Sequence, residues 1–285
     1  MDISIVTPFY KGNAYIPQLL NWIEKAASQI PTSSVEWLIL NDSPNIEVNK
    51  ISTNAPNLNI KFLVNPRNLG IQKTRINGIN QSSGKYILLL DQDDEITSDA
   101  FKIHLQNFAN SSCDLSITNG FSEDKNGSLT PLFKSKHQLQ KTSSLRLYFT
   151  IGNLIASPGM VMIRKEAISN PWKDNPLKIN GADDWLLWVF MLSEGAKIST
   201  VFANTYTHKA VEQNTSDDNE KMIESSLEAL NIFEATSSSR FMHLCKAYRR
   251  RLAMRQAWEN DGKSKAKAYL SNPDLAWDLF MYKFL

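Results

Sequence analysis

The feature that most constrains the fold is a short apolar run followed at once by carboxylates, GKYILLLDQDDE at residues 84–95. The five consecutive apolar residues 86–90 are too few for a free-standing helix and are typical of a strand buried on both faces of a parallel sheet. Such a strand delivers the next residues to the carboxyl edge of the sheet, where open α/β folds bind their ligands. We therefore expect Asp91, Asp93 and Asp94 to lie at that edge.

These carboxylates are close enough to repel one another, by about 4 kcal/mol for two charges ~4 Å apart at an effective dielectric of about 20. A divalent cation among the oxygens relieves this repulsion, so the cluster favours a site for Mg²⁺ or Mn²⁺. A structural interpretation stays open, because acidic clusters after strands are also ordinary turn chemistry and Asp93 or Asp94 also suits the N-cap of a helix beginning near Thr97.

Composition and charge exclude several classes of protein. Hydrophobic residues make up 42% and charged residues 21% of the 285, and the formal net charge of +2 is too small to indicate a nucleic-acid partner. Cys113 and Cys245 are far apart in the sequence, so we expect no disulfide framework and a reducing, cytoplasmic compartment. We expect neither a signal peptide nor a membrane-spanning helix, because no window reaches ~18 apolar residues.

The N-terminal part alternates predicted strands with predicted helices. Short apolar strands are expected at residues 3–6, 37–40 and 60–64, with helices from about residue 14 and through residues 71–79. The Thr-Pro pair at residues 7 and 8 is expected to stop the first strand. This alternation predicts a mostly parallel, doubly wound α/β sheet.

Each of these strands is followed by polar residues suited to binding a nucleotide, namely Thr7 with Pro8, Asp42, Asn68 and Asp91. Neither a GxGxxG segment after the first strand nor a P-loop is present, which argues against dinucleotide oxidoreductases and P-loop NTPases. The phosphates of a nucleotide are then expected to be held through a metal.

After residue 110 the pattern changes. Asn126-Gly127 predicts a type I′ hairpin. Asp183 and Asp184 open an amphipathic helix, where the helix dipole alone also favours acidic residues. The remaining expected elements are a helix at 144–155 and strands at 114–118, 160–163 and 197–202, the last running on to His208.

From residue 217 the chain is expected to be helical, with apolar stripes that are most simply core and an N-cap at Ser238 or Ser239. Arginines 249–251 and the aromatic segment 275–285 are compatible with a basic, aromatic surface that rests on a membrane. Packing of this tail on its own domain is the alternative.

Together these motifs resemble those of a family 2 glycosyltransferase of the GT-A fold, over roughly residues 1–216 and in the order of that family. The matching segments are VTPFY (6–10), WLILNDSP (37–44), NLGIQKTRINGI (68–79), LLLDQDD (88–94) and ADDWLLW (182–188). The resemblance implies a nucleotide-binding half over 1–110, an acceptor half over 111–216 and a C-terminal helical region over 217–285.

The resemblance also implies roles for individual residues. Asp93 is implied as a ligand of the Mn²⁺ or Mg²⁺, with His208 beside it, and Asp184 as the general base. Asp183 and Trp185 are implied as acceptor contacts. The implied nucleotide contacts are Thr7, Pro8 and Tyr10 at the base, Asp42 at the edge of the base (commonly uracil), Arg75 near the base or phosphates, Asp91 at the ribose, and Asn68 and Gln92 beside them.

Two positions depart from the family's pattern. Residues 41–44 read Asn-Asp-Ser-Pro where relatives usually carry two acids and a glycine, which changes the loop but keeps the base contact. Asp183 stands where the acidic pair usually begins with glutamate, so its acceptor contact is one methylene shorter.

The implied function is the metal-assisted transfer of a sugar, with inversion, from a nucleotide sugar to a hydroxyl of a glycan, glycolipid or glycosylated protein. The resemblance implies a UDP-sugar as the donor, because the base in this family is commonly uracil. Two rivals remain. A sugar nucleotidyltransferase should show a glycine-rich, basic loop after its first strand, and residues 9–13 match that poorly. A catalytically silent partner that binds nucleotide or glycan would not need Asp93 and Asp184. The expected location is the cytoplasm, at the inner membrane face if the tail contacts lipid.

Overall fold

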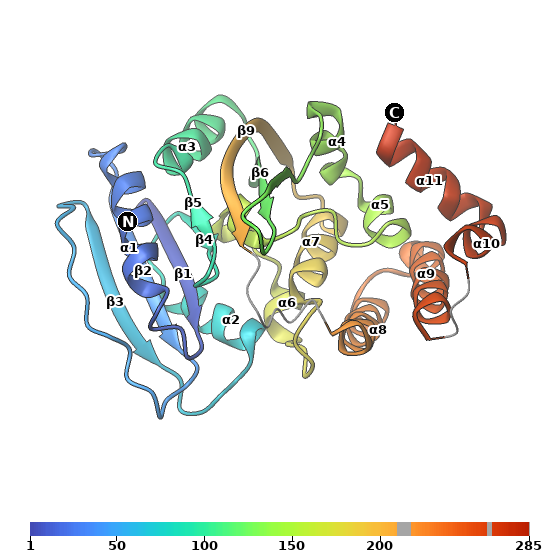
Figure 1. Cartoon of the computed structure of the whole chain (residues 1–285), viewed down its shortest axis with the longest axis horizontal. Helices are drawn as coiled ribbons and strands as arrows, with labels where there is room; N and C mark the ends of the chain where they lie inside the picture. Colours follow the sequence, from blue (N-terminus) through green and yellow to red (C-terminus); the bar gives the residue numbers. More distant parts are fainter. Residues whose placement is uncertain (210–217, 261–263, 285) are drawn as a thin grey trace. The chain divides into compact units, whose positions relative to one another are not determined.

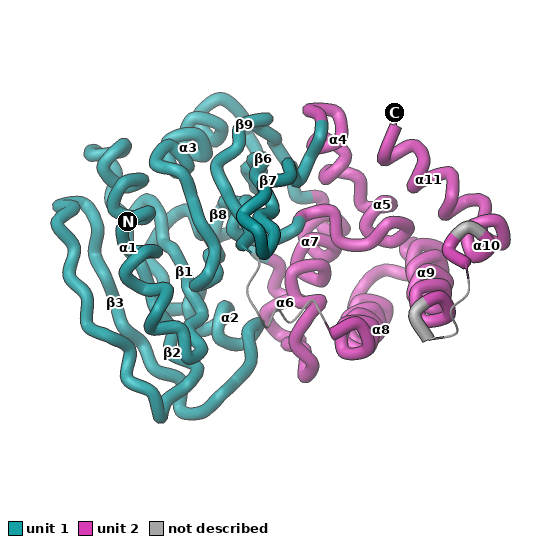
Figure 2. The backbone as a smooth tube through the Cα atoms, viewed as in Figure 1, with its two compact units in different colours: residues 1–134, 156–168, 196–212 teal, residues 135–155, 169–195, 213–285 magenta. Residues whose placement is uncertain are grey.

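The computed structural model describes residues 1–209, 218–260 and 264–284. The chain forms two compact units, each assembled from segments that are separate in the sequence (Figure 2). Unit 1 comprises residues 1–134, 156–168 and 196–212, and unit 2 comprises residues 135–155, 169–195 and 213–285. The domain boundaries at residues 110 and 216 stay predictions.

Unit 1 is built on one mixed sheet (Figure 1). Its first four strands are mutually parallel, β8 runs antiparallel to both of its neighbours, and β6 and β9 are parallel. The predicted α/β fold with a parallel N-terminal half is confirmed. In spatial order the strands are β3 (Leu58–Val64), β2 (Val35–Asn41), β1 (Ile3–Phe9), β4 (Tyr86–Leu89), β8 (Val161–Arg164), β6 (Leu115–Glu123), β9 (Ile198–Lys209) and β5 (Glu95–Ile96), with β7 (Leu129–Pro131) paired to β6.

Continuous apolar runs form the central strands because these strands are covered on both faces. Every residue of β2 and β4 is buried. Helix α2 (Ile71–Gln81) packs on β1 and β2, and Gly78 permits the close approach, since a Cβ there would lie 2.4 Å from Val6 Cγ1. The helices α1 (Ile16–Ser28) and α3 (Ala100–Asn110) pack against each other.

The prediction that Thr7 and Pro8 stop the first strand was wrong, because β1 continues to Phe9 with Pro8 paired to Leu40. Residues two apart in a strand point their backbone groups to the same side, so Pro8 faces the side on which Val6 O accepts from Leu90 N at 3.1 Å. The ladder with β4 ends there. The missing N–H of proline therefore leaves no ladder bond unmade.

The predicted hairpin is present between β6 and β7, but its predicted turn type was wrong. A type I′ turn needs positive φ at both central residues, whereas Gly127 has φ +78° and Asn126 is not among the described residues with positive φ. The loop instead closes with Asp124 N bonded to Ser128 O at 3.0 Å and Gly127 N to Asp124 O at 2.9 Å. This is a three-residue loop whose glycine takes the left-handed position.

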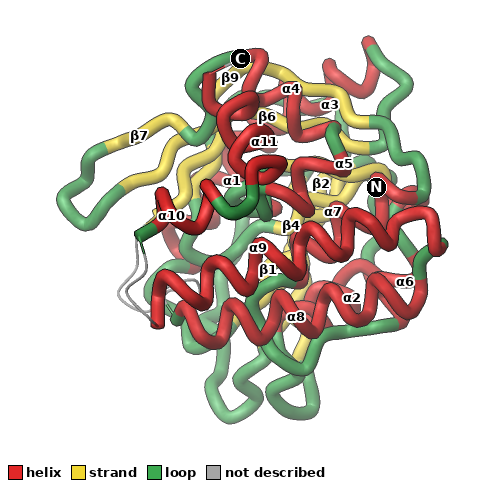
Figure 3. Tube along the Cα trace, turned by 90° about the vertical axis from the view of Figure 1, so that its right-hand side faces the viewer, coloured by secondary structure: helices red, strands yellow, loops and turns green. Residues whose placement is uncertain are grey.

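Unit 2 is helical and has an aromatic core. Trp185 stacks on Tyr248 with ring centres 4.3 Å apart, and Phe149 contacts Phe233 at 5.4 Å. Helices α8 and α9 lie side by side (Figure 3). The α-helices are α4 (Lys136–Gln140), α5 (Leu145–Thr150), α6 (Asn170–Asp174), α7 (Asp183–Ser193), α8 (Asn219–Thr236), α9 (Met242–Asn260), α10 (Lys265–Leu270) and α11 (Pro273–Phe284).

Helix α5 is shorter than the predicted 144–155. It ends at Thr150 because Gly152, with φ +110°, takes the chain out of the helical conformation. A Cβ at Gly152 would lie 2.6 Å from Arg251 Nη2, so a side chain there would also displace that arginine.

The arginines 249–251 have partners within unit 2, as the alternative of a tail packed on its own domain implies. Arg249 pairs with Glu234 at 2.5 Å and Arg250 with Asp274 at 2.5 Å. Arg251 lies 5.9 Å from the centre of the Tyr248 ring, and burial lowers its pKa. Arg249 and Arg250 are thus neutralised by acids of unit 2 although both side chains are 47% exposed, and the membrane contact of this tail stays a prediction. Among the described residues no helix combines the length and apolarity needed to cross a membrane.

Glu36 is a fully buried carboxylate that ties together the starts of three strands. It accepts hydrogen bonds from Ser4 Oγ at 2.5 Å, Ser83 N at 2.5 Å and Lys61 Nζ at 2.6 Å. Burial alone would raise its pKa, but the hydrogen bonds from Lys61, Ser4 and Ser83 together lower the pKa from 4.5 to about 2. Its ionised form is therefore favoured by folding.

We expect Glu36→Gln to lower the free energy of unfolding by about 2 to 3 kcal/mol at pH 7, because the charge-assisted bonds are lost. A carboxyl whose pKa is depressed by folding stabilises the protein above its unfolded pKa and ceases to do so as the pH falls through the folded value. The difference between variant and wild type should therefore shrink between pH 4.5 and about pH 2. Urea unfolding across this range measures it. The control is Glu166→Gln, whose side chain is 81% exposed; a difference independent of pH would contradict the assignment to charge.

Candidate functional site

Asp42 follows β2 at the carboxyl edge of the parallel strands and organises the loop after β3. Its Oδ1 accepts from Asn65 Nδ2 and Leu69 N, both at 2.8 Å, and its Oδ2 accepts from Gly70 N at 3.0 Å. A carboxylate has about four lone-pair positions, and these bonds occupy three of them, with Asp42 itself 5% exposed. Asn68, also predicted at this edge, is exposed and its Oδ1 accepts from Gly70 N at 3.0 Å.

Arg75 and Asp91 come together across the same edge. Arg75 Nη2 lies 2.6 Å from Asp91 Oδ1, with the arginine side chain 3% and the aspartate side chain 27% exposed. The buried guanidinium thus holds the first carboxylate of the acidic cluster in place, while part of that carboxylate remains open to a ligand.

Gln92 connects the acidic cluster to the loop after β1. Its side-chain amide accepts from Tyr10 N at 3.0 Å and donates to Tyr10 O at 3.1 Å. The close approach requires Gly12, since a Cβ there would lie 2.0 Å from Gln92 Oε1. Gln92 therefore positions the loop that carries Tyr10, whose side chain is 49% exposed.

Thr7 does not present its side chain at this edge. It is fully buried, and its Oγ1 accepts from Trp37 Nε1 at 2.9 Å. The prediction that its side chain lines a base pocket disagrees with this burial. Tyr10 is exposed and Pro8 is half-buried, and their contact with a base stays a prediction.

The helix-capping interpretation of the acidic cluster was wrong. Helix α3 begins at Ala100 and its N-cap residue is Asp99, so neither Asp93 nor Asp94 caps it. Between the cluster and that helix lies the short strand β5, which the sequence did not predict. The cluster therefore needs another explanation than helix capping.

Asp94 is the buried centre of a polar cluster. Its Oδ2 accepts from Ser157 Oγ at 3.1 Å and from the Tyr206 hydroxyl, and its Oδ1 lies 3.1 Å from His208 Nδ1. Burial raises the pKa of Asp94, and the hydrogen bond to Asp94 raises the pKa of His208. The structure thus brings His208 to the acidic cluster, as predicted, and adds Ser157 and Tyr206.

Asp93 is half-buried between two other acids. Burial and the negative charges of Asp94 and Asp91 raise its pKa to about 6. A cation beside it would remove this electrostatic penalty, and oxygen and imidazole donors suit Mn²⁺. Among the described residues no three acidic, histidine or cysteine side chains are already grouped so that they could hold a metal ion. The donors near Asp93 therefore suit an ion by their chemistry, but they do not form a complete coordination site.

In unit 2 the acidic pair begins helix α7, as predicted. Asp184 Oδ2 accepts from Asn153 Nδ2 at 2.7 Å and its Oδ1 accepts from Trp185 N at 2.7 Å. Asp183 is 4% exposed, and its backbone carbonyl accepts from Trp172 Nε1 at 2.7 Å. Asp184 is half-buried, so its carboxylate remains partly accessible to solvent.

Trp185 belongs to the core of unit 2. Its side chain is 2% exposed, its ring stacks on Tyr248, and its Nε1 donates to Tyr148 O at 2.9 Å. The prediction that Trp185 contacts an acceptor disagrees with this burial.

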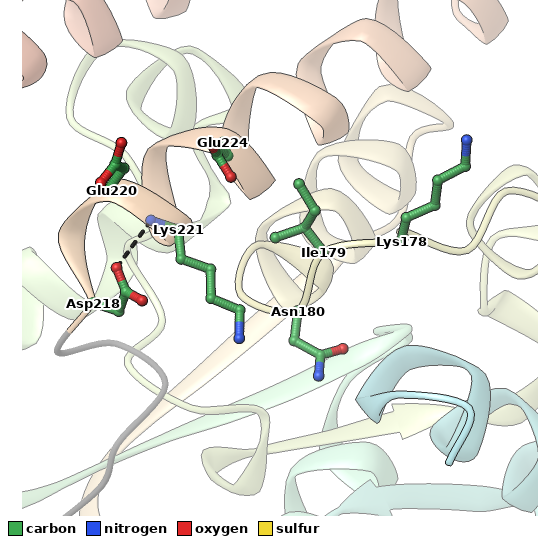
Figure 4. A pocket seen from close by; sticks show the side chains of 7 residues that line it. All are labelled: Lys178, Ile179, Asn180, Asp218, Glu220, Lys221 and Glu224. Atoms are coloured by element: carbon green, nitrogen blue, oxygen red, sulfur yellow. Dashed lines mark hydrogen bonds between the residues drawn. The ribbon is translucent and has the colours of Figure 1, made fainter. Parts of the chain in front are cut away.

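A separate open pocket of about 450 Å³ lies in unit 2 (Figure 4). Its lining mixes acidic and basic side chains from the segment before α7 and from the start of α8. None of the predicted site residues lines it. The lining residues are Lys178, Ile179, Asn180, Asp218, Glu220, Lys221 and Glu224.

Sequence reasoning missed Ser157, Tyr206 and Asn153 as members of the two candidate sites. A partial signal existed for Tyr206, which lies two residues before His208 and so shares its face of the strand. Ser157 and Asn153 gave no signal, because each meets its partner only through contacts between segments distant in the sequence.

A family model described as Glycosyl transferase family 2 matches residues 4–170, more than half of the chain. The chain itself matches no curated protein. Solved structures resemble this chain over nearly its whole length. TarS 1–349 from S. aureus, in complex with UDP-GlcNAc, has a TM-score of 0.63 at 18% identity, covering 99% of this chain and 80% of TarS 1–349.

Two further solved structures show the same fold. TarS 1–349 in complex with UDP has a TM-score of 0.62 at 18% identity, with 100% of this chain and 81% of the other covered. The mannosyltransferase PcManGT from Pyrobaculum calidifontis, in complex with GDP-Man and Mn²⁺, has a TM-score of 0.57 at 13% identity, covering 99% and 81%.

Proposed function

The chain belongs to glycosyl transferase family 2, and from this premise we propose that it transfers a sugar from a UDP-sugar to a hydroxyl of a glycan, glycolipid or glycosylated protein, with inversion. The observation that carries the proposal is the acidic cluster at the carboxyl edge of β4, with Asp91 fixed by Arg75 and Asp94 by Tyr206 and His208. Residues 91–94 do form a turn, in which Asp94 N donates to Asp91 O at 3.3 Å, but a backbone turn alone does not require three carboxylates.

In this proposal Asp93 and His208 hold Mn²⁺ or Mg²⁺ at the diphosphate. The ion, when bound, acts as a Lewis acid that stabilises the negative charge on the departing diphosphate. A solved relative of the same fold, PcManGT, is described with GDP-Man and Mn²⁺. Asp91, Arg75, Gln92 and Tyr10 bind or shape the nucleotide side.

Asp184 is proposed as the general base that takes the proton from the acceptor hydroxyl. Its carboxylate is held by Asn153 and by the Trp185 backbone N–H, and it is half-buried. Asp183 is proposed to support the acceptor side. Because no residue stands out as a covalent nucleophile, direct displacement and inversion are the simpler course.

Uridine is the proposed nucleoside, because the remaining lone pair of Asp42 Oδ2 suits the N3–H that uracil has and cytosine lacks. An unpaired buried polar group costs about 1 to 3 kcal/mol, so CDP should bind about tenfold or more weakly than UDP. Titration calorimetry of UDP, CDP and GDP with Mn²⁺ measures this, and hydrolysis of a panel of UDP-sugars identifies the donor. CDP binding as tightly as UDP would contradict the role of Asp42.

We also propose that α11 rests on an anionic membrane surface. Three exposed aromatic residues at i, i+3 and i+7 form one stripe: Trp277 (61% exposed), Phe280 (46%) and Phe284 (71%). The acids of this helix are neutralised, since Asp274 pairs with Arg250 and Asp278 with Arg146. The basic residues of α10 and α11 are the lysines at 265, 267 and 283, of which Lys265 also lies 5.4 Å from the centre of the Trp258 ring. Their positive charge suits anionic headgroups.

The protein should therefore float with vesicles containing phosphatidylserine and detach at high salt, because each lysine near the surface contributes about 1 kcal/mol. The double substitution Trp277→Ser, Phe280→Ser should lower the bound fraction at least about tenfold. Phe202→Ser, which removes another aromatic side chain that is 46% exposed, is the control. If the wild-type protein does not bind anionic vesicles, the aromatic stripe of α11 contacts protein instead.

A further inference from the structure

We infer that Asp94 is a positioning residue for His208: its carboxylate holds the Nδ1–H of the imidazole and so leaves Nε2 as the nitrogen offered to the cation. This inference rests on the proposed function for the use of Nε2. The orientation of the ring itself follows from contacts within unit 1.

Strand pairing places the two residues opposite each other. The short strand β5 is antiparallel to β9, with Ile96 opposite Tyr206 and Glu95 opposite Thr207. The next pair in this register is Asp94 and His208. A carboxylate and an imidazole that are 114 residues apart in sequence are thus brought together by a two-residue strand.

The two oxygens of Asp94 have separate tasks. Oδ2 accepts from both the Tyr206 hydroxyl and Ser157 Oγ, whereas Oδ1 faces His208 Nδ1 at 3.1 Å. Asp94 is 1% exposed and the His208 side chain 34%. Because Nδ1 points to the buried carboxylate, the exposed edge of the ring is the one that carries Nε2.

Packing fixes the carboxylate in this orientation. The Tyr206 ring, itself 1% exposed, lies against Gly159, where a Cβ would be 2.6 Å from Tyr206 Cε2. Gly159 N in turn donates to Ser157 Oγ at 3.1 Å, which directs the serine proton toward Asp94. Rotation of the Asp94 side chain would break both hydroxyl contacts.

The chemistry of the pair then determines the tautomer. An ionised carboxylate only accepts hydrogen bonds, and Asp94 Oδ1 at 3.1 Å lies nearer to Nδ1 than the Tyr206 hydroxyl at 3.5 Å, so Nδ1 carries the hydrogen. When the imidazole is neutral, its lone pair is then on Nε2. Carboxylates that orient metal-binding histidines in this way typically contribute 10-fold to 100-fold to metal affinity.

Asp94→Asn tests the inference sharply because the two oxygens of Asp94 have different hydrogen-bond partners. The asparagine oxygen can still accept from Tyr206 and Ser157, which places its NH₂ group against His208 Nδ1. That nitrogen must then accept, so the tautomer should switch to Nε2–H. Nitrogen-15 NMR of the metal-free protein, at a pH high enough for His208 to be neutral, distinguishes the two forms, and four histidines in the chain make assignment practicable.

We expect Nδ1–H in wild type, Nε2–H in Asp94→Asn, and Mn²⁺ affinity in the presence of UDP about 10-fold to 100-fold weaker in the variant. The matched control is Asp114→Asn, at the other end of β6 and β9, where the aspartate side chain accepts from Lys197 N at 2.8 Å. Its tautomer pattern and Mn²⁺ affinity should equal those of wild type.

Nε2–H at His208 in wild type would overturn the inference without any variant, and so would an Asp94→Asn protein that keeps Nδ1–H. A switched tautomer with unchanged Mn²⁺ affinity would overturn the positioning role. Wild type that does not bind Mn²⁺ at all, with the expected tautomers present, would overturn the metal part of the proposed function while supporting the orientation of the ring.

Discussion

Replacing Asp184 with asparagine should lower the rate of sugar transfer by about 10²-fold to 10⁴-fold, which is the usual contribution of a positioned general base. Asparagine keeps the volume of the side chain but cannot take a proton. The affinity for UDP should stay within about twofold, because the proposed nucleotide contacts belong to unit 1 and Asp184 to unit 2.

The variant also loses part of a structural contact. Asp184 accepts from both Asn153 Nδ2 and Trp185 N, and an asparagine has one oxygen to share between them. We expect a loss of about 1 kcal/mol of stability from this change. Transfer rate, UDP affinity and melting temperature must therefore be measured together.

Asp218→Asn provides the matched control in the same unit. Asp218 is the N-cap of α8 and accepts from Lys221 N at 3.1 Å, and asparagine caps helices equally well. It should leave the rate unchanged. Transfer by Asp184→Asn within a few-fold of wild type would refute the base assignment, whereas loss of UDP binding would mean that Asp184 maintains the nucleotide site.

The parts of the fold that could be predicted from sequence are those set by local pattern. Strands β2 and β4 are buried on both faces, and such burial requires the uninterrupted apolar runs that the sequence displays. The acids after β4 reach the carboxyl edge because a parallel strand inside the sheet ends at that edge, and the residues that follow it lie there. Their position followed from the chain alone.

The pairing of Asp94 with His208 could not be predicted, because it depends on strand register over a long sequence separation. Strand β9 is displaced against β6 by irregularities on either side of Asn119, where the partner changes from Val201 for Thr118 to Asn204 for Asn119 and Tyr206 for Gly120. Nothing local in the sequence fixes the size of that displacement. The separate register of β5 against β9, with Glu95 opposite Thr207 and Ile96 opposite Tyr206, then decides which residue of β9 lies opposite Asp94.

Several residues with a functional appearance have side chains that are buried or paired, for the same reason. Thr7 and Trp185 are buried against Trp37 and Tyr248, and Arg249 is paired with Glu234. In each case the partner lies in another element. A polar or aromatic residue type indicates which interactions a side chain can make, but tertiary packing decides whether those interactions are left for a ligand.

Asp93→Ala should abolish the dependence of UDP binding on Mn²⁺ and lower transfer by about 10²-fold to 10³-fold. The magnitude reflects the several kcal/mol that a cation contributes by stabilising charge on a departing phosphate. In wild type, burial and the charges of Asp91 and Asp94 act against an ionised Asp93, and a bound cation reverses that penalty. Without Asp93 the remaining donors have lost their central carboxylate.

The measurement is UDP titration with Mn²⁺ and with chelator, for wild type and for Asp93→Ala. Asp99→Asn is the control for a general change of charge, because Asp99 is an exposed acid six residues further along whose Oδ1 accepts from Thr97 Oγ1. It should keep the full effect of Mn²⁺. Equal metal dependence in wild type and Asp93→Ala would show that Asp93 is not a ligand. The cation would then have to be held by Asp91, at the expense of its 2.6 Å pair with Arg75.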